Sequence, residues 1–167
     1  MSENTGFPPI AKLDAKILIL GSMPGVKSFE KNQYYANPRN TFWSIMIKLL
    51  NGDEELNYQQ RKKLLTNNRI ALWDVLKSCY REGSLDSNID HSTIIANDFN
   101  LFLNKQKQIK TILFNGGETE KLFNKYVMKT LDNKEIEYFK LPSTSPAHAA
   151  MSFDEKLLKW QVIKELL

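Results

Sequence analysis

The apolar residues of this chain gather in four short runs that predict β-strands. The runs occupy residues 16–20 (KILIL), 70–73 (IALW), 111–114 (TILF) and 136–139 (IEYF). The first and third are continuous rather than alternating, which is typical of strands covered on both faces. The intervals between the runs are long enough for crossover helices, so the strands can be parallel neighbours in one sheet.

Apolar residues recur at helical spacing between and after these strands. They predict helices over residues 42–50, 94–103, 118–131 and 154–167. Alternating strands and helices favour an α/β fold, a three-layer α/β/α sandwich with a central four-stranded, mostly parallel sheet. No repeat or linker-like tract divides the chain. One domain over residues 1–167 is therefore expected, with residues 1–14 as a loosely ordered N-terminal segment.

The composition narrows the class of protein. Hydrophobic residues make up 42% and charged residues 25%, as in an ordinary globular domain. No apolar run is long enough to span a membrane, and the N-terminus has no signal-peptide core, so we expect a cytoplasmic protein and no membrane partner. We also expect a monomer. One cysteine, Cys79, and two histidines argue against a zinc site, and no metal or cofactor is expected. The 23 Lys and Arg against 19 Asp and Glu permit a polyanionic partner without requiring one.

Small and polar residues follow all four predicted strands. These segments are residues 21–25 (GSMPG), Asp74, residues 115–117 (NGG) and residues 141–146 (LPSTSP). Ligands of parallel α/β sheets bind beyond the carboxyl ends of the strands, where these segments should meet. Gly, Ser, Thr and Asn allow close backbone approach and offer neutral donors suited to phosphates. Turns also need such residues, but four such segments at one edge favour a binding site.

Two of these segments belong to longer motifs that resemble the signature motifs of the uracil-DNA glycosylase superfamily. The first covers residues 21–43, where YANPRNTFW (35–43) takes the place of the Phe-Ala-Asn-Pro-x-Asn-x-Phe-Trp of the mismatch-specific branch. The second covers residues 141–149 (LPSTSPAHA). With LWDV (72–75), REGSLD (81–86) and LFNGG (113–117), the chain is most similar to the hypoxanthine-DNA glycosylase (DNA-deoxyinosine glycosylase) family.

The resemblance implies a function in base excision repair. A monofunctional DNA glycosylase without metal or cofactor would flip a deaminated base, hypoxanthine or uracil, out of DNA. It would then hydrolyse the N-glycosidic bond and leave an abasic site. Two alternatives stay open: a lesion- or nucleotide-binding protein that keeps the fold but has lost catalysis, and a nucleoside hydrolase. Activity on free inosine would distinguish the hydrolase.

Handling of the attacking water is inferred from the first motif. Related uracil enzymes carry Asp or Asn at the position of Met23, whose side chain can neither activate nor orient water, so we expect only its backbone to contribute, beside Ser22. The resemblance implies that Asn40 orients the attacking water instead, because its amide can accept from water and donate to the sugar or base. Asn40 could also cap the helix that follows, and the two roles are compatible.

Three residues are expected to bind the base. Tyr35 takes the position of the family's stacking Phe, whereas Tyr34 should pack beneath the next helix. Asp74 aligns with an amide residue that reads the uracil edge in related enzymes. As a carboxylate it would accept from N1–H of hypoxanthine, while Asn115 or a backbone N–H donates to O6. The alternative for Asp74 is a cap or an ion pair with Arg81.

The DNA backbone is expected to meet the loops of both motifs. Basic residues of the first motif would form a modest rim, and the second motif would approach the minor groove with hydroxyl and N–H groups on phosphates. His148 would lie near the vacated stack or, alternatively, serve as a surface or capping residue. The expected DNA-contacting residues are Gly25, Lys27, Ser28, Arg39, Ser143, Thr144, Ser145, Pro146 and His148.

Overall fold

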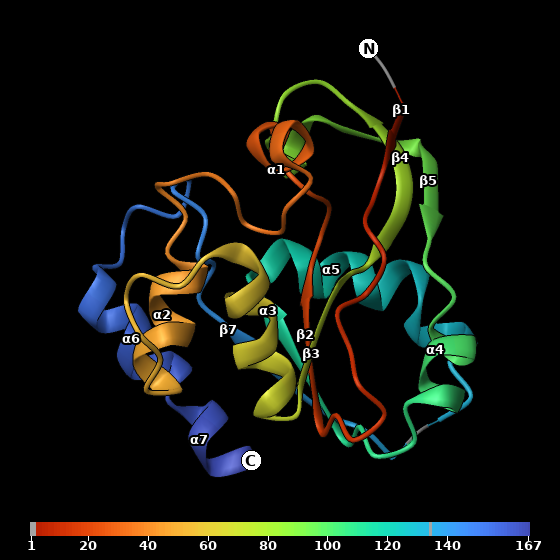
Figure 1. Ribbon diagram of the computed structural model, residues 1–167. Helices are drawn as coiled ribbons and strands as arrows, with labels where there is room; N and C mark the ends of the chain where they lie inside the picture. Colours follow the sequence, from red (N-terminus) through yellow and green to blue (C-terminus); the bar gives the residue numbers. More distant parts are fainter. Residues whose placement is uncertain (1–2, 134) are drawn as a thin grey trace.

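Four parallel strands form the central sheet, in the order β3-β2-β6-β7 (Figure 1). The computed structural model describes residues 3–133 and 135–167. The strands are β2 (Ile17–Gly21), β3 (Ile70–Asp74), β6 (Thr111–Asn115) and β7 (Glu137–Leu141). All four predicted strands are confirmed at nearly the predicted bounds. Every residue of β2, β3 and β6 is buried, which explains their continuous apolar runs.

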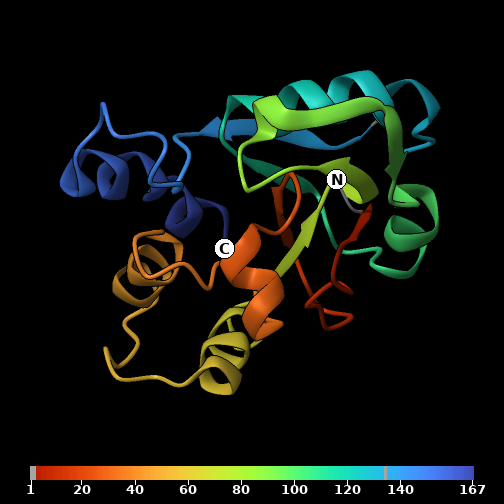
Figure 2. The same cartoon turned by 90° about the horizontal axis from the view of Figure 1, so that it is seen from above.

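Helices cover both faces of this sheet (Figures 1 and 2). On one face, Ile17 and Ile19 pack in a core with α2 (Phe42–Leu49), α3 (Tyr58–Asn67), α6 (Phe153–Trp160) and α7 (Val162–Leu166). On the other face, Leu18 and Leu20 pack in a core with α4 (Phe99–Lys105) and α5 (Gly117–Tyr126). Because successive strand residues point to opposite faces, each strand contributes side chains to both cores. The predicted three-layer α/β/α sandwich is confirmed.

A second, antiparallel sheet lies beside the parallel one and was not predicted. It has the order β1-β4-β5, formed by β1 (Glu3–Thr5), β4 (Leu76–Arg81) and β5 (Ile89–Ala96). The helix predicted over residues 94–103 is therefore wrong in its first part, because Ile95 pairs with β4. Helix α4 begins only after Asp98, whose side chain accepts from Leu101 N and caps it. A short apolar run fits both the helical and the strand periodicity, and here the pairing with β4 decides for the strand.

The remaining helices agree with the sequence in part. Residues 118–131 form α5 and a 3-10 turn, η2 (Met128–Thr130), and residues 154–167 form α6 and α7. Helices α1 (Val26–Lys31) and α3 were not predicted, because each buries a single residue and shows no apolar stripe. Within the described residues, no helix is both long and apolar enough to cross a membrane.

The N-terminal segment is attached to both sheets, so the expected loose order is wrong for residues 3–10. Strand β1 pairs with β4, and Gly6 N donates to the Lys77 carbonyl at 2.8 Å. Ile10 forms a bridge with Leu72 at the outer edge of β3. These contacts arise between backbone groups, which a loop-like composition does not reveal. Residues 1 and 2, part of the same prediction, lie outside the described residues.

Candidate functional site

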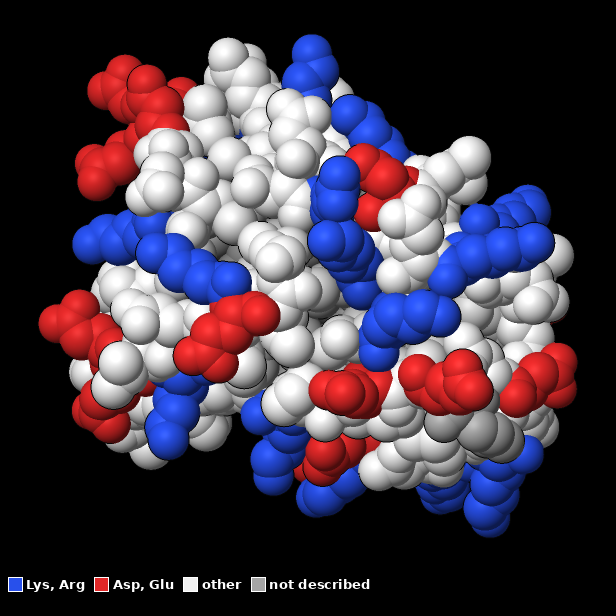
Figure 3. All heavy atoms as spheres, turned by 90° about the horizontal axis from the view of Figure 1, so that it is seen from below, with Lys and Arg blue, Asp and Glu red and all other residues white. Residues whose placement is uncertain are grey.

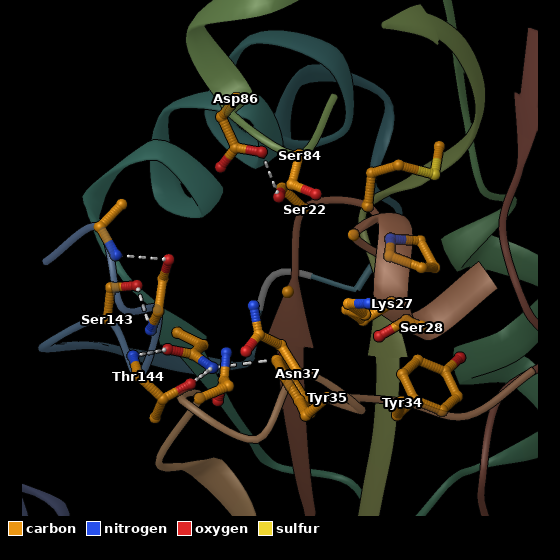
Figure 4. Close-up of a pocket in the computed structure, with 18 of the residues that line it drawn as sticks. Ser22, Lys27, Ser28, Tyr34, Tyr35, Asn37, Ser84, Asp86, Ser143 and Thr144 are labelled. Carbon is orange, nitrogen blue, oxygen red and sulfur yellow. Dashed lines mark hydrogen bonds between the residues drawn. The ribbon is translucent and has the colours of Figure 1, made fainter. Parts of the chain in front are cut away.

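A pocket of about 210 Å³ opens at the carboxyl edge of the parallel sheet (Figure 4). The segments that follow β2, β3, β6 and β7 all line it, as the sequence predicts, together with the loop between β4 and β5. A second cavity of about 480 Å³ adjoins it and is lined by Gly117, Ser145 and His148 among others. The side chains around the first pocket include Ser22, Met23, Tyr35, Asn40, Asp74, Asp86, Asn115 and Ser143.

Asn115, the last residue of β6, joins three segments of the site. Its amide nitrogen donates to Tyr35 Oη at 3.2 Å and to Thr144 Oγ1 at 2.9 Å. Its Oδ1 accepts from Thr144 N at 2.9 Å. Both amide hydrogens are used within the protein, so Asn115 has no donor left for a base. The expected donation from Asn115 to O6 conflicts with this arrangement, in which the residue positions Tyr35 and Thr144 instead.

Tyr35 is held against the end of β2. Its backbone is left-handed (φ 54°), which is uncommon for a residue other than glycine, and its ring stacks on Phe42 with centroids 4.2 Å apart. A Cβ at Gly21 would lie 2.7 Å from Tyr35 Oη and 2.6 Å from Asp74 Oδ1. Only glycine therefore fits at this close approach. Burial and the neighbouring Asp74 raise the pKa of Tyr35, so the phenol stays protonated.

Tyr34 packs as the sequence predicts. It is buried in the core that includes Trp43, and its backbone carbonyl accepts from Trp43 Nε1 at 2.8 Å. Its hydroxyl donates to the Pro8 carbonyl at 2.8 Å. The hydroxyl is therefore engaged with the N-terminal segment, which leaves Tyr35 as the better placed of the two rings for a stacked base.

Asp74 carries a buried carboxyl group at the pocket. The residue is 4% exposed, and Oδ2 has no hydrogen-bond partner in the part of the chain that the structure describes. Burial and, secondarily, the nearby Asp86 raise the pKa of Asp74 to about 7, against the opposing effect of Arg81. The alternative of an ion pair between Asp74 and Arg81 is wrong. Arg81 lies 3.7 Å from Asp86 Oδ1 and donates to the carbonyls of Gly83 and Pro24.

Asp86 is a site residue that the sequence reasoning did not single out. It begins the short 3-10 turn η1 (Asp86–Asn88) between β4 and β5 and lines both cavities. Ser22 Oγ donates to its Oδ1 at 2.8 Å (Figure 4), and burial raises the pKa of Asp86. The signal was present in the segment REGSLD, but only the fold brings Asp86 to Ser22. Met23, the next residue, is 7% exposed and packs into the core that includes α4 and α5.

Asn40 combines a structural contact with a place at the pocket. Its Oδ1 accepts from Phe42 N at 2.9 Å and so satisfies the first N–H group of α2. The N-cap position itself belongs to Thr41, so the expectation that Asn40 is the N-cap is wrong by one residue, although its side chain does stabilise the start of the helix. Within the described residues its amide nitrogen has no protein partner and remains able to donate to a ligand. The role of Asn40 in orienting water stays a prediction.

Several residues expected to contact DNA instead hold the loops together. Thr144 is 1% exposed, bonds to Asn115, and its carbonyl accepts from Thr41 N at 3.1 Å. Ser28 is 5% exposed, and its Oγ accepts from Ala36 N at 3.2 Å. A direct contact of either side chain with phosphate conflicts with this burial. The polar groups here stabilise the site from within.

The other expected DNA-contacting residues lie nearer the surface. Lys27, Arg39 and His148 are exposed, and Gly25, Ser143, Ser145 and Pro146 are half-buried. Lys27 also forms an exposed ion pair with Glu30 at 3.4 Å. In the second motif, Ser143 Oγ accepts from Ser145 N at 3.2 Å, and Ser145 Oγ accepts from Ala147 N at 3.1 Å. These contacts define the loop, and its interaction with DNA stays a prediction.

Basic side chains are not confined to the motif loops. The view from below, toward the amino ends of the parallel strands, shows Lys and Arg interspersed with Asp and Glu (Figure 3). The net charge of +4 is therefore distributed, and it does not by itself identify a DNA-binding face.

The sequence and the fold both match one group of known proteins. The profile of the uracil DNA glycosylase superfamily matches residues 8–167. A Methanosarcina barkeri protein named hypoxanthine DNA glycosylase is 41% identical over 115 residues, which cover 68% of this chain and 72% of that protein. A Methanosarcina acetivorans protein of the same name is 36% identical over 162 residues, 95% of this chain and 96% of its own length. The solution NMR structure of a candidate uracil DNA glycosylase from M. acetivorans superposes with a TM-score of 0.78 at 34% identity, covering 99% of both chains. The chain therefore belongs to the uracil DNA glycosylase superfamily.

Proposed function

We propose that this protein is a monofunctional DNA glycosylase that excises hypoxanthine from DNA and leaves an abasic site. The observation that carries the proposal is the pocket at the carboxyl edge of the sheet, which Asn40, Tyr35 and Asp74 all line. The names of the two Methanosarcina relatives support hypoxanthine as the first substrate. Uracil is the second candidate, because it also presents an N–H group beside a carbonyl.

The size of the pocket favours a single base as its occupant. Its volume of about 210 Å³ lies below the roughly 300–1,000 Å³ of pockets that enclose drug-sized ligands. A base within duplex DNA can reach such a cavity only by leaving the stack, which costs a few kcal/mol and costs least for a mispaired or damaged base. The pocket would therefore select bases that pair weakly as well as bases that fit.

The residues at the pocket suit hydrolysis without a covalent enzyme intermediate. Asn40 can orient water through its amide, and DNA phosphates can stabilise the positive charge that develops on the sugar as the glycosidic bond breaks. A lysine nucleophile would need to be desolvated. Lys27, the lysine at the rim of the pocket, is exposed and paired with Glu30, which is the arrangement of a solvated cation. We therefore expect base removal without strand cleavage.

The test is an excision assay on duplex oligonucleotides that carry one hypoxanthine, uracil, xanthine or ethenocytosine. With protein in excess, the hypoxanthine strand should break at the lesion only after alkali treatment. Intact strands for all four lesions would refute the proposal. Binding without cleavage under the same conditions would instead identify a lesion-binding protein. Hydrolysis of free inosine, insensitive to salt, would identify a nucleoside hydrolase, since DNA binding weakens steeply as salt rises.

A further inference from the structure

Asp74 brings to the pocket a carboxyl group with one unsatisfied oxygen. The residue is 4% exposed, and among the described residues Oδ2 has no hydrogen-bond partner. Its backbone, by contrast, pairs with Gly21 of β2, and its carbonyl accepts from Asn97 Nδ2 at 2.8 Å. The missing side chain at Gly21 leaves space for the carboxyl, because a Cβ there would lie 2.6 Å from Oδ1. The fold thus holds the backbone of Asp74 in place and buries Oδ2 at the wall of the pocket without a hydrogen bond from the described residues.

The groups around Asp74 disfavour its ionised form. Tyr34 and Tyr35, from the segment before α2, are neutral because burial raises their pKa values. Arg81, from β4, directs its guanidinium to Asp86 and to backbone carbonyls. Asp86, from the loop between β4 and β5, is a like charge. Burial and Asp86 together raise the pKa of Asp74 to about 7, so a neutral carboxyl is well populated at neutral pH.

The edge of a hypoxanthine base needs both a donor and an acceptor from the protein. Its N1–H donates and its O6 accepts, whereas an ionised carboxylate only accepts and would repel O6. Asn115 cannot supply the donor, because both of its amide hydrogens are bound to Tyr35 and Thr144. A neutral carboxyl carries one donor and one acceptor on adjacent atoms, which complements this edge.

We propose that Asp74 binds the flipped base as a neutral carboxylic acid, whose hydroxyl donates to O6 of hypoxanthine while its other oxygen accepts from N1–H. This inference rests on the proposed function and names its substrate class. The class comprises bases with an N–H beside a carbonyl, which includes uracil and xanthine. A methyl group on N1 of hypoxanthine would remove the donor and exclude the base.

The test compares wild type, Asp74→Asn and Asp74→Leu in single-turnover excision of hypoxanthine from pH 5.5 to 8.5. The wild-type rate should fall about tenfold per pH unit above neutrality, as the carboxyl ionises. The Asn variant carries the same donor and acceptor without a titrating proton, so its rate should stay level and exceed the wild-type rate at pH 8.5. The Leu variant, similar in size, should be slow at every pH. The Asn series also controls for titration of the DNA and of the base.

Two results would overturn the inference. One is an Asn variant as slow as the Leu variant at every pH, which would instead mean that Asp74 acts by transferring its proton. The other is a wild-type rate that does not fall above neutrality. Thermal denaturation of each variant checks its fold. Binding of DNA with an uncleavable 2′-fluoro deoxyinosine, measured by fluorescence anisotropy, tests Asp74 even if no cleavage occurs. Loss of wild-type affinity above pH 7 supports the inference and a flat profile refutes it, whereas absent cleavage at all pH values refutes the proposed function alone.

Discussion

Replacing Asn115 by alanine tests whether this residue assembles the site or contacts the base. The substitution removes the hydrogen bonds to Tyr35 Oη, Thr144 Oγ1 and Thr144 N. Since Thr144 is 1% exposed, its N–H would be left without an acceptor and without access to water. Both motif loops would lose their common attachment to β6. We therefore expect the variant to lose stability and activity together.

The magnitude follows from the three bonds. At about 0.5–1.5 kcal/mol for each intramolecular hydrogen bond, the free energy of unfolding should fall by about 2–4 kcal/mol. For a chain of 167 residues, each kcal/mol shifts Tm by about 2–4 °C, so Tm should fall by about 5–15 °C. Displacing Tyr35 and the second motif should slow excision by about 100-fold, the effect of a small misplacement in an active site.

Thermal denaturation and single-turnover excision of hypoxanthine measure the two effects. The matched control is Asn124→Ala, because Asn124 is an exposed residue of α5, outside both cavities, without a side-chain hydrogen bond within the described residues. This control should leave Tm and rate almost unchanged. If Asn115→Ala lost activity while its Tm stayed within about 2 °C of wild type, the positioning role would be refuted and direct contact with the base supported.

Three further predictions concern the first motif. Asn40→Ala should slow excision by about 100-fold and lower Tm, whereas Asn40→Asp keeps the capping oxygen and should lose rate at unchanged Tm; a normal rate in both would remove Asn40 from catalysis. Gly21→Ala should abolish excision, because its Cβ would displace the Asp74 carboxyl and the Tyr35 hydroxyl; an active variant would contradict this close approach. Met23→Leu should keep its rate within about threefold, since only the backbone is needed there and such core exchanges are tolerated; a large loss of rate at unchanged Tm would refute the expectation that the Met23 backbone alone contributes.

The parts of the fold that the sequence predicts are those with buried apolar runs. Strands β2, β3 and β6 are wholly buried and therefore stand out, as does α2 with its buried stripe. Strand β1, by contrast, has the polar sequence ENT and exists because β4 pairs with it. Helix α3 buries only Leu65, so its hydrophobic pattern gives little indication of a helix. Its capping box (Asn57 with Gln60) is the better sequence indicator of where this helix begins.

In the site, the sequence predicts which residues meet but not how they pair. Strand order places Gly21, Asp74 and Asn115 at one edge, as expected. The partners of a polar side chain depend on angles and distances within the folded site, which residue types do not determine. Asn115 could equally have faced a base, and Arg81 could have paired with Asp74 instead of Asp86. The partners of Asn115 and Arg81 depend on the conformation of the loops around the site, which the sequence pattern does not predict.

The attachment of the N-terminal segment to both sheets also bears on self-association. Strand β1 covers the outer side of β4, and Ile10 bridges to the outer side of β3. Uncovered strand edges present rows of unpaired N–H and C=O groups that recruit strands from other molecules. A segment within the same chain occupies these positions at a high local concentration and outcompetes such partners. Proteolytic loss of residues 3–10 would uncover the outer sides of β4 and β3 at once, and it would also remove the Pro8 carbonyl to which Tyr34 donates, so aggregation is the failure to expect from that cut.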